Sequence, residues 1–162
     1  MIKLANLRMP PNKQIVPFNV SHVFQMEMKP MEQEFVDSTP DFIENLMSNA
    51  NPDYSWTGVA DGKIVAIFGV SELWPGVCDL WMIPSVHINE HAMAVVRGAK
   101  AVIDKAADDF ETRRLQITVR EDNQIAYRFA RALGFDVECI MKSYGPEGAD
   151  YYLMSRIKEC LD

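Results

Sequence analysis

Cysteine is scarce in this sequence, and the cysteines that occur follow no disulfide or metal-binding pattern. The 162 residues contain three of them, Cys78, Cys139 and Cys160, scattered along the chain without a C-x-x-C pair. An odd set of this kind excludes a disulfide framework and a zinc ribbon as the basis of the fold. We therefore expect reduced thiols and a cytoplasmic protein.

Long apolar runs and an excess of basic residues are also absent. No run reaches the about eighteen apolar residues that a membrane helix needs, and the N-terminal sequence MIKLANLRMPPNKQ lacks the apolar segment of a signal peptide. Acidic residues outnumber basic ones by 23 to 16, which gives a net charge of −7. The sequence therefore predicts neither a membrane nor nucleic acid as the main partner.

The composition that is present is typical of one globular domain. Hydrophobic residues make up 48% of the chain and charged residues 24%, and no repeat or low-complexity tract divides it. We predict a single domain over residues 14–162, preceded by an N-terminal arm over residues 1–13. The arm contains Pro10-Pro11 and several apolar residues, which we expect to pack on a neighbouring subunit or another partner. The alternative is that the arm folds back over its own sheet as an extra edge strand.

Apolar alternation and turn signals predict strands at both ends of the chain and in its centre. The Asp61-Gly62 pair is a strong hairpin signal between two β-rich runs. Strands are expected at 14–18, 54–60, 63–71, 77–83, 114–119, 136–143 and 150–157.

Helical periodicity fills the gaps between these strands. Helices are expected at 22–37 with a break at Pro30, at 40–49 with Thr39 as N-cap, at about 89–109, and from Asp122 or Asn123 to Gly134. Helix-linked strands in the second half predict an α/β fold in which helices cover both faces of a mixed sheet.

One helix carries a recognisable motif. The run Asn123-x-x-Ala126-x-x-Phe129-x-x-x-Leu133-Gly134-Phe135, between the strand RLQITV and two further strands, resembles the last coenzyme A motif of the GNAT N-acetyltransferases. The order of elements over residues 14–157 matches that fold as well. More narrowly, SWTGVADGKIVAIFGVSE, DLWMIPS, VREDNQIAYRFARALGF and SYGPEGADYYLMSRI resemble a small phage-encoded branch of GNAT-like proteins, some of which are internal virion proteins.

The resemblance implies a GNAT acyl-CoA N-acyltransferase-like fold and transfer of an acetyl group from acetyl-CoA to an amine. In that family the pantetheine chain lies like an extra strand beside a central strand, bonded by backbone groups. The region around Met26, Met28 and Met31 would form the acceptor side of the cleft. The cofactor-binding residues implied here are Leu80, Trp81, Met82, Ile83, Asn123, Ala126 and Phe129.

The expected cradle for the pyrophosphate of coenzyme A departs from the family pattern. A GNAT protein has a glycine-rich loop with a basic residue at this point, where backbone N–H groups close on the phosphates. The corresponding stretch here, Pro84 to Ala92, contains no glycine, lysine or arginine and carries Glu90. Arg97-Gly98 lies inside the helical periodicity. We therefore expect acetyl-CoA binding to be weak or lost.

The catalytic groups are not fixed by any spacing. Many GNAT proteins use a tyrosine in the last helix as general acid, and Ala130 occupies that position here. Tyr127, almost one turn earlier, is a weak candidate for the acid, and Glu72 and Asp79 are weak candidates for the base.

A rival motif is His87-Ile88-Asn89-Glu90-His91, which matches the zinc-binding pattern H-x-x-E-H. That pattern needs both histidines on one helix and a third ligand. Because Asn89 is expected to cap a helix, the two imidazoles would not share a face, and we predict no metal.

Two functions therefore stay open. One is an N-acetyltransferase with a degenerate pyrophosphate loop, acting on a small-molecule or protein amine. The other is a non-catalytic phage virion or assembly protein with the GNAT fold, whose partners would be further copies of itself or virion proteins. The unusual loop and missing tyrosine favour the second function, and the Asn123 helix favours the first. A phage-encoded protein would lie in the host cytoplasm or in the virion.

Overall fold

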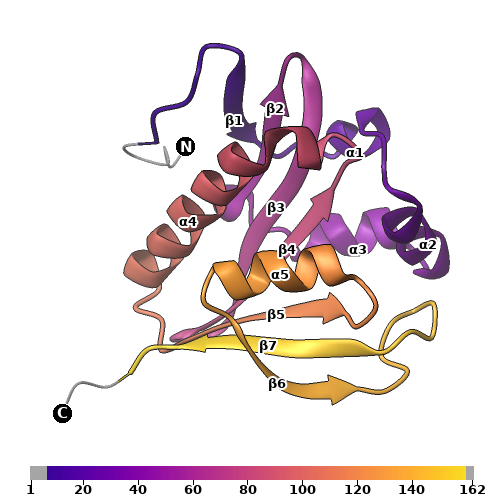
Figure 1. The fold of residues 1–162 in the computed structure, drawn as a ribbon, viewed down its shortest axis with the longest axis vertical. Coiled ribbons are helices and arrows are strands. Elements are labelled where there is room, and N and C mark those ends of the chain that lie inside the picture. Colours follow the sequence, from indigo (N-terminus) through magenta and orange to yellow (C-terminus); the bar gives the residue numbers. More distant parts are fainter. Residues whose placement is uncertain (1–6, 160–162) are drawn as a thin grey trace.

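The computed structural model describes residues 7–159, in which seven strands form one mixed sheet (Figure 1). The strands are arranged in the order β1-β2-β3-β4-β5-β7-β6. Their bounds are β1 Lys13–Pro17, β2 Ser55–Ala60, β3 Lys63–Trp74, β4 Val77–Pro84, β5 Arg114–Arg120, β6 Asp136–Met141 and β7 Tyr151–Ile157. All seven predicted strands are present, and the α/β fold is confirmed.

Five α-helices connect or flank these strands. Their bounds are α1 Ser21–Gln25, α2 Pro30–Ser38, α3 Phe42–Asn49, α4 Ala92–Asp109 and α5 Gln124–Ala132. None of the helices within residues 7–159 is long and apolar enough to cross a membrane. Cys78 and Cys139 are free thiols, and Cys160 lies outside the described residues.

Two predicted helix starts are wrong. The helix expected from Pro40 begins at Phe42. Asp41 adopts a left-handed conformation (φ 52°), so the helix does not extend back to Pro40 and Thr39 is not its N-cap. The helix expected from about residue 89 begins at Ala92. Residues Ile88–His91 before it form a 3-10 turn. The chain leading into this turn is held by the buried Ser85, whose hydroxyl oxygen accepts a hydrogen bond from the His87 N–H at 3.1 Å.

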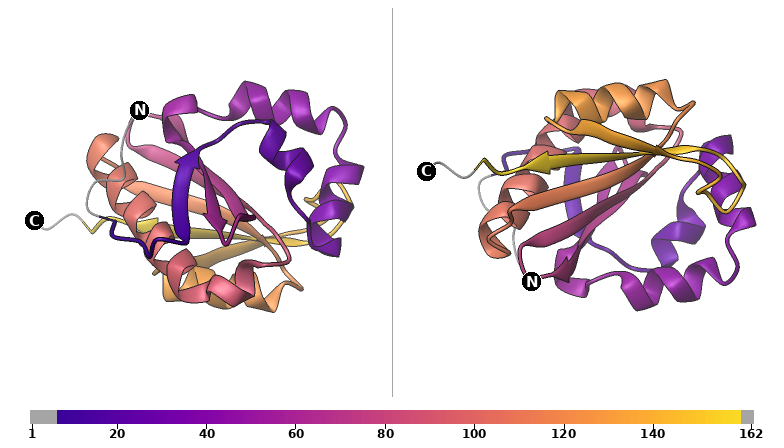
Figure 2. Two further views of the ribbon diagram at one scale, coloured as in Figure 1. Left: turned by 90° about the horizontal axis from the view of Figure 1, so that it is seen from above. Right: turned by 90° about the horizontal axis from the view of Figure 1, so that it is seen from below.

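The helices form two layers, one on each face of the sheet (Figure 2). Helices α4 and α5 cover one face, where Val102 and Ile103 of α4 and Ala130 of α5 pack against Cys78 and Leu115. Helices α1 to α3 cover the other face around a second apolar cluster. That cluster contains Val23, Met26 and Ile67, with Phe18, Phe42, Ile43, Leu46, Trp81 and Ile83 packed against them.

The sheet is interrupted at its centre. Strands β4 and β5 are parallel and pair only over Val77 to Asp79 and Arg114 to Gln116. Beyond Asp79, β4 stays paired with β3 up to Pro84, while β5 stays paired with β7 up to Arg120. The two strands therefore diverge after three pairs, and Figure 1 shows their C-terminal ends pointing apart.

Candidate functional site

A cleft of about 660 Å³ opens where β4 and β5 diverge, and we call it the sheet cleft. Its lining comes from both layers of helices. On one face it is lined by Ala99, Val102 and Ile103 of α4, by Ala126, Phe129 and Ala130 of α5, and by the two residues that flank α5, Asn123 and Leu133. On the other it is lined by Met31, Glu32, Phe35 and Val36 of α2 and by Phe42, Asn45, Leu46 and Asn49 of α3. The sheet cleft thus joins the two faces of the sheet.

The divergence leaves one edge of β4 without a neighbouring strand. Between Leu80 and Pro84 the backbone of β4 pairs with β3 on one side only. Strand backbone alternates its N–H and C=O groups between the two edges, so the free edge presents unpaired donors and acceptors to the sheet cleft. An extended chain of amide groups can bind there as an added strand.

Helix α5 brings a polar side chain to the same cleft. Asn123 is the N-cap of α5, and its Oδ1 accepts a hydrogen bond from the Ala126 N–H at 3.1 Å. This bond explains the asparagine at the helix start and leaves its amide donors available to a ligand. All seven residues implied as cofactor contacts, Leu80 to Ile83 together with Asn123, Ala126 and Phe129, line the sheet cleft.

Asp79 lies at the point of divergence. It is the last β4 residue that pairs with β5, opposite Gln116, and it lines the sheet cleft. Burial raises the pKa of the Asp79 carboxyl above its usual range, although a hydrogen bond from the Gln116 side chain opposes this shift. A carboxylate with a raised pKa inside a cleft is suited to accept a proton.

The other two catalytic candidates lie elsewhere. Glu72 is exposed on β3 opposite Cys78 and is not among the residues that line the sheet cleft. Tyr127 packs against Tyr152 with ring centroids 5.5 Å apart, and it does not line the cleft either. Ala130, one turn further along α5, does line it and carries no hydroxyl group.

Sequence reasoning missed several polar residues of the sheet cleft. Glu32 lies on α2, Arg120 ends β5, and Tyr151 begins β7 opposite Arg120. Burial, and next the Glu147 carboxylate, raise the pKa of Tyr151, so its hydroxyl stays protonated. No local spacing marks these residues, because they come together only through the β5–β7 pairing and the approach of α2.

The two histidines of the H-x-x-E-H motif lie in different surroundings. His87 Nε2 lies 3.6 Å from Glu27 and its Nδ1 3.7 Å from Glu90, whereas His91 lines a separate cavity. Within residues 7–159, no group of three or more histidine, cysteine, aspartate or glutamate side chains is placed to hold a metal ion.

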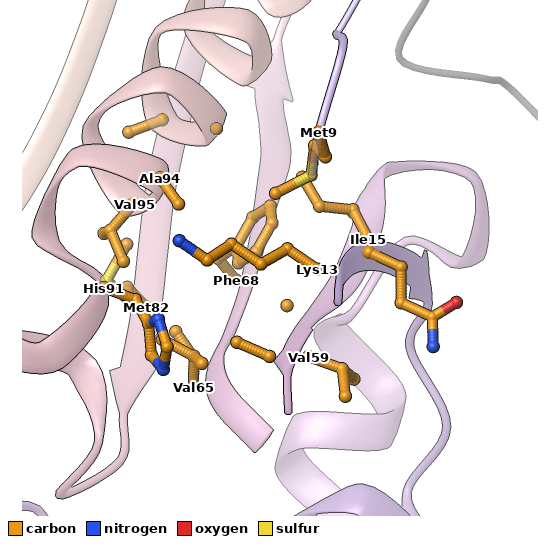
Figure 3. Close-up of a pocket in the computed structure, with 16 residues that line it drawn as sticks. Met9, Lys13, Ile15, Val59, Val65, Phe68, Met82, His91, Ala94 and Val95 are labelled. Carbon is orange, nitrogen blue, oxygen red and sulfur yellow. The ribbon is translucent and has the colours of Figure 1, made fainter. Parts of the chain in front are cut away.

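That separate cavity lies between α4 and strands β1 to β3 (Figure 3). Its volume is about 50 Å³, and its walls are mostly apolar. Figure 3 shows Met9 of the N-terminal arm, Lys13, Phe68 and Val95 around it. The space is far smaller than the sheet cleft, so we do not assign it to a cofactor.

Among solved structures the fold is similar to Ard1 from Thermoplasma volcanium, with a TM-score of 0.71 and 15% identity over 92% of this chain and 99% of that one. It is similar to RimL, a ribosomal L7/L12 alpha-N-protein acetyltransferase in complex with coenzyme A, with a TM-score of 0.65 and 15% identity over 91% and 95% of the chains.

A third similar structure is an acetyltransferase of the GNAT family from Bacillus anthracis, with a TM-score of 0.65 and 13% identity over 90% of this chain and 95% of that one. No curated protein matches the sequence. Residues 20–135 match the Acetyltransferase (GNAT) family, a stretch that includes α1 to α5 and strands β2 to β5. The chain belongs to the GNAT acetyltransferase family.

Proposed function

We propose that this protein transfers an acetyl group from acetyl-CoA to an amine. The observation that carries the proposal is the sheet cleft, which connects the α4–α5 face with the α2–α3 face exactly where β4 offers a free backbone edge. Acyl transfer needs two substrates to meet at one point, and a cleft that is open to both faces lets each enter from its own side.

The residues present fit the pantetheine part of acetyl-CoA better than its phosphates. The free edge of β4 from Leu80 matches the amides of pantetheine, and the Asn123 amide can donate a hydrogen bond to it. The first turn of α5 also has backbone N–H groups without helical acceptors. Beyond β4, by contrast, the backbone N–H of His87 is bonded to Ser85, and Glu90 adds negative charge.

Asp79 supplies the proton acceptor in this proposal. When bound, acetyl-CoA supplies the acetyl group as a thioester. The amine nitrogen forms a C–N bond to the acetyl carbon, the C–S bond breaks, and the amine proton passes to the Asp79 carboxylate. The departing thiolate takes a proton from solvent, since Ala130, which lines the cleft, carries no hydroxyl group.

Calorimetry with acetyl-CoA, followed by an assay of free thiol release in the presence of amines, tests the proposal. We expect a dissociation constant on the order of hundreds of micromolar, or roughly −5 kcal/mol. S-acetylpantetheine, which lacks the phosphates, should bind within about threefold of acetyl-CoA, because the loop contributes little. If neither acetyl-CoA nor S-acetylpantetheine binds at millimolar concentration, the proposal is contradicted.

A second candidate is a non-catalytic phage virion or assembly protein that keeps the fold. The specific observation in its favour is the stretch from Ser85 to His91, in which a 3-10 turn and two glutamate contacts to His87 stand in place of a phosphate cradle. This candidate expects no acetyl-CoA binding and association with itself or with virion proteins. For the first candidate, the enzyme, we propose a cytoplasmic location. If the enzyme is encoded by a phage, this is the cytoplasm of the host.

A further inference from the structure

A network of polar side chains connects Asp79 with the outer strands of the sheet. Its members come from the neighbouring strands β4, β5, β7 and β6 (Figure 1). We call it the polar network, and it consists of Asp79, Arg114, Gln116, Glu138 and Ser155. Residues next to these members in the sequence pack in the core under α4 and α5, namely Cys78, Leu115 and Met154. Because side chains alternate along a strand, the polar network lies on the opposite face of the sheet.

Gln116 links Asp79 to the rest of the polar network. The two residues stand opposite each other in the β4–β5 register, and the Gln116 side chain donates a hydrogen bond to the Asp79 carboxyl. The Oε1 atom of Gln116 accepts a hydrogen bond from Arg114 Nε at 2.8 Å. Asp79 lines the sheet cleft and Gln116 does not, so Gln116 acts on a substrate only through Asp79.

The Arg114 guanidinium determines which way the Gln116 amide points. A guanidinium group has donors only, whereas a side-chain amide has an acceptor oxygen at one corner and a donor nitrogen at the other. Arg114 therefore binds the amide oxygen, and the amide nitrogen is directed towards Asp79, whose ionised carboxylate can only accept. The reverse orientation of the amide would place oxygen against oxygen and donor against donor.

Arg114 is itself held in one orientation. Its Nη1 and Nη2 atoms donate to the two carboxylate oxygens of Glu138 at 2.6 and 2.9 Å. The hydroxyl of the buried Ser155 donates to the same carboxylate at 2.6 Å. A bidentate pair of this kind has a defined geometry, because the guanidinium and the carboxylate are both planar. The Nε atom is thus left pointing at Gln116.

We propose that Arg114 and Gln116 are positioning residues that hold the Asp79 carboxylate in place to accept the proton of the amine. A carboxylate has two oxygens, so a hydrogen bond from Gln116 to one of them leaves the other to accept that proton. Arg114, like Gln116, is not among the residues that line the sheet cleft. This inference rests on the proposed acetyl transfer and adds the residues that orient its base.

The groups around Asp79 outside the polar network stay the same in the variants that test this inference. The partner of Asp79 on β3 is Ser71, which is uncharged. Burial, and next the Glu72 carboxylate, raise the pKa of the adjacent Cys78 thiol to about 11, so it stays neutral. The other charged or polar groups from the elements around the cleft are Glu32 of α2, Asn45 and Asn49 of α3 and Arg120 of β5.

Titration of the Asp79 carboxyl, followed by ¹³C NMR of the protein without acetyl-CoA, tests the role of Gln116. Gln116→Met removes the donor and keeps the length of the side chain, so the carboxylate loses a bond that favours its charged form. We expect the titration midpoint to move to higher pH. The signal is identified by its loss in Asp79→Asn. A midpoint that stays at the wild-type pH in folded Gln116→Met would overturn the role of Gln116.

Arg114→Lys separates the orientation of the amide from the charge of the arginine. Lysine keeps the positive charge but cannot bind Gln116 and both oxygens of Glu138 at the same time. The Gln116 amide can then turn, and the midpoint should again rise. Arg131→Lys is the matched control, because Arg131 pairs with Asp136 and does not line the sheet cleft. A midpoint that both lysine variants raise equally, or that neither raises, would overturn the role of Arg114.

Kinetics separate this inference from the proposed function. In an active enzyme, Gln116→Met and Arg114→Lys should lower kcat at pH 7 about tenfold, leave KM for acetyl-CoA unchanged and move the acidic limb of kcat to higher pH. An active enzyme whose limb and NMR midpoint stay in place in both variants would overturn the inference, while acetyl transfer stands. If no amine is acetylated but both variants raise the midpoint, the enzyme proposal is wrong and the hold of Arg114 and Gln116 on Asp79 stands.

Discussion

Asp79 is the residue on which the proposed chemistry depends most. Replacing it with asparagine keeps the size of the side chain and removes the proton acceptor. We expect Asp79→Asn to lower kcat by about 10²-fold or more, with the affinity for acetyl-CoA unchanged. The exposed Asp104 of α4 provides the control, since Asp104→Asn should leave kcat unaltered.

The pH profile gives a second test of Asp79. Burial raises the pKa of this carboxyl, so protonation sets in at a higher pH than for an ordinary aspartate. A protonated carboxyl cannot accept the amine proton, and kcat should therefore fall as the pH decreases through the raised pKa. This acidic limb should be missing in Asp79→Asn. A variant that keeps the limb would show that another group titrates.

Tyr127 is expected to contribute little to catalysis. Its ring packs against Tyr152 outside the sheet cleft, so its hydroxyl is not placed to protonate a leaving thiolate. Tyr127→Phe should change kcat by less than about twofold, whereas loss of a general acid typically costs about 10²-fold. Steady-state kinetics of the folded variant measure this change in kcat. A loss of about 10²-fold would identify Tyr127 as the general acid.

Glu138 on β6 links stability to pH. Arg114 donates to both carboxylate oxygens at 2.6 and 2.9 Å, the Ser155 hydroxyl donates at 2.6 Å, and these bonds lower the pKa of Glu138 to about 2. A lowered pKa stabilises the fold above the unfolded-state value of roughly 4.5, and the stabilisation is lost as the pH falls towards 2.

We therefore expect Glu138→Gln to lower the free energy of unfolding by about 1 kcal/mol at pH 7. This value is discounted for solvent screening, because the Glu138 side chain is 37% exposed. Denaturant titrations of both proteins should show a constant difference above pH 5 that shrinks towards zero near pH 2. A difference that persists at pH 2 would mean that packing, not charge, accounts for it.

At the scale of elements, α5 combines a structural and a binding role in one side chain. The Oδ1 atom of Asn123 caps the helix, and the same residue lines the sheet cleft, where its amide N–H groups can donate to a ligand. Asn123→Ser keeps a capping oxygen and removes the amide, so the melting temperature should stay close to that of the wild type while acetyl-CoA binding weakens.

The matched change is Asn123→Ala, which removes both groups. It should lower the stability by about 1 kcal/mol in addition to weakening acetyl-CoA binding. Calorimetric titrations and thermal melts of the two variants separate the roles. If Asn123→Ser binds acetyl-CoA as well as the wild type, the amide of Asn123 makes no contact with pantetheine.

The sequence predicts features that depend on residues close together in the chain better than features that depend on tertiary contacts. Local signals were sufficient for the β2–β3 hairpin, whose Asp61 and Gly62 both have positive φ, and for the Asn123 cap. The start of α3 was missed, because Asp41 adopts a left-handed conformation that few residue types other than glycine favour. Glu32 and Arg120 were missed because only tertiary packing brings α2 to the end of β5.

At the scale of the whole molecule, the question is whether the N-terminal arm packs on its own domain or on another protein chain. The sequence suggested an arm that packs on a neighbouring subunit or virion partner. Met9, however, lines the small cavity beside α4, the Asn12 amide donates to Asp61 at 2.8 Å, and the Asp61 N–H donates to the Asn12 carbonyl at 2.9 Å. The described part of the arm therefore contacts the domain itself, while residues 1–6 lie outside the described range.

Deleting residues 1–12 should consequently lower the melting temperature of the monomer by several degrees. The deletion removes the Asn12 contacts with the β2–β3 hairpin and exposes apolar lining of the small cavity, a loss of about 1 to 2 kcal/mol for a domain of this size. Thermal melts and sedimentation of the deleted and complete chains provide the measurement. An unchanged melting temperature together with lost self-association would instead show that the arm serves assembly, and it would favour the non-catalytic candidate over the enzyme.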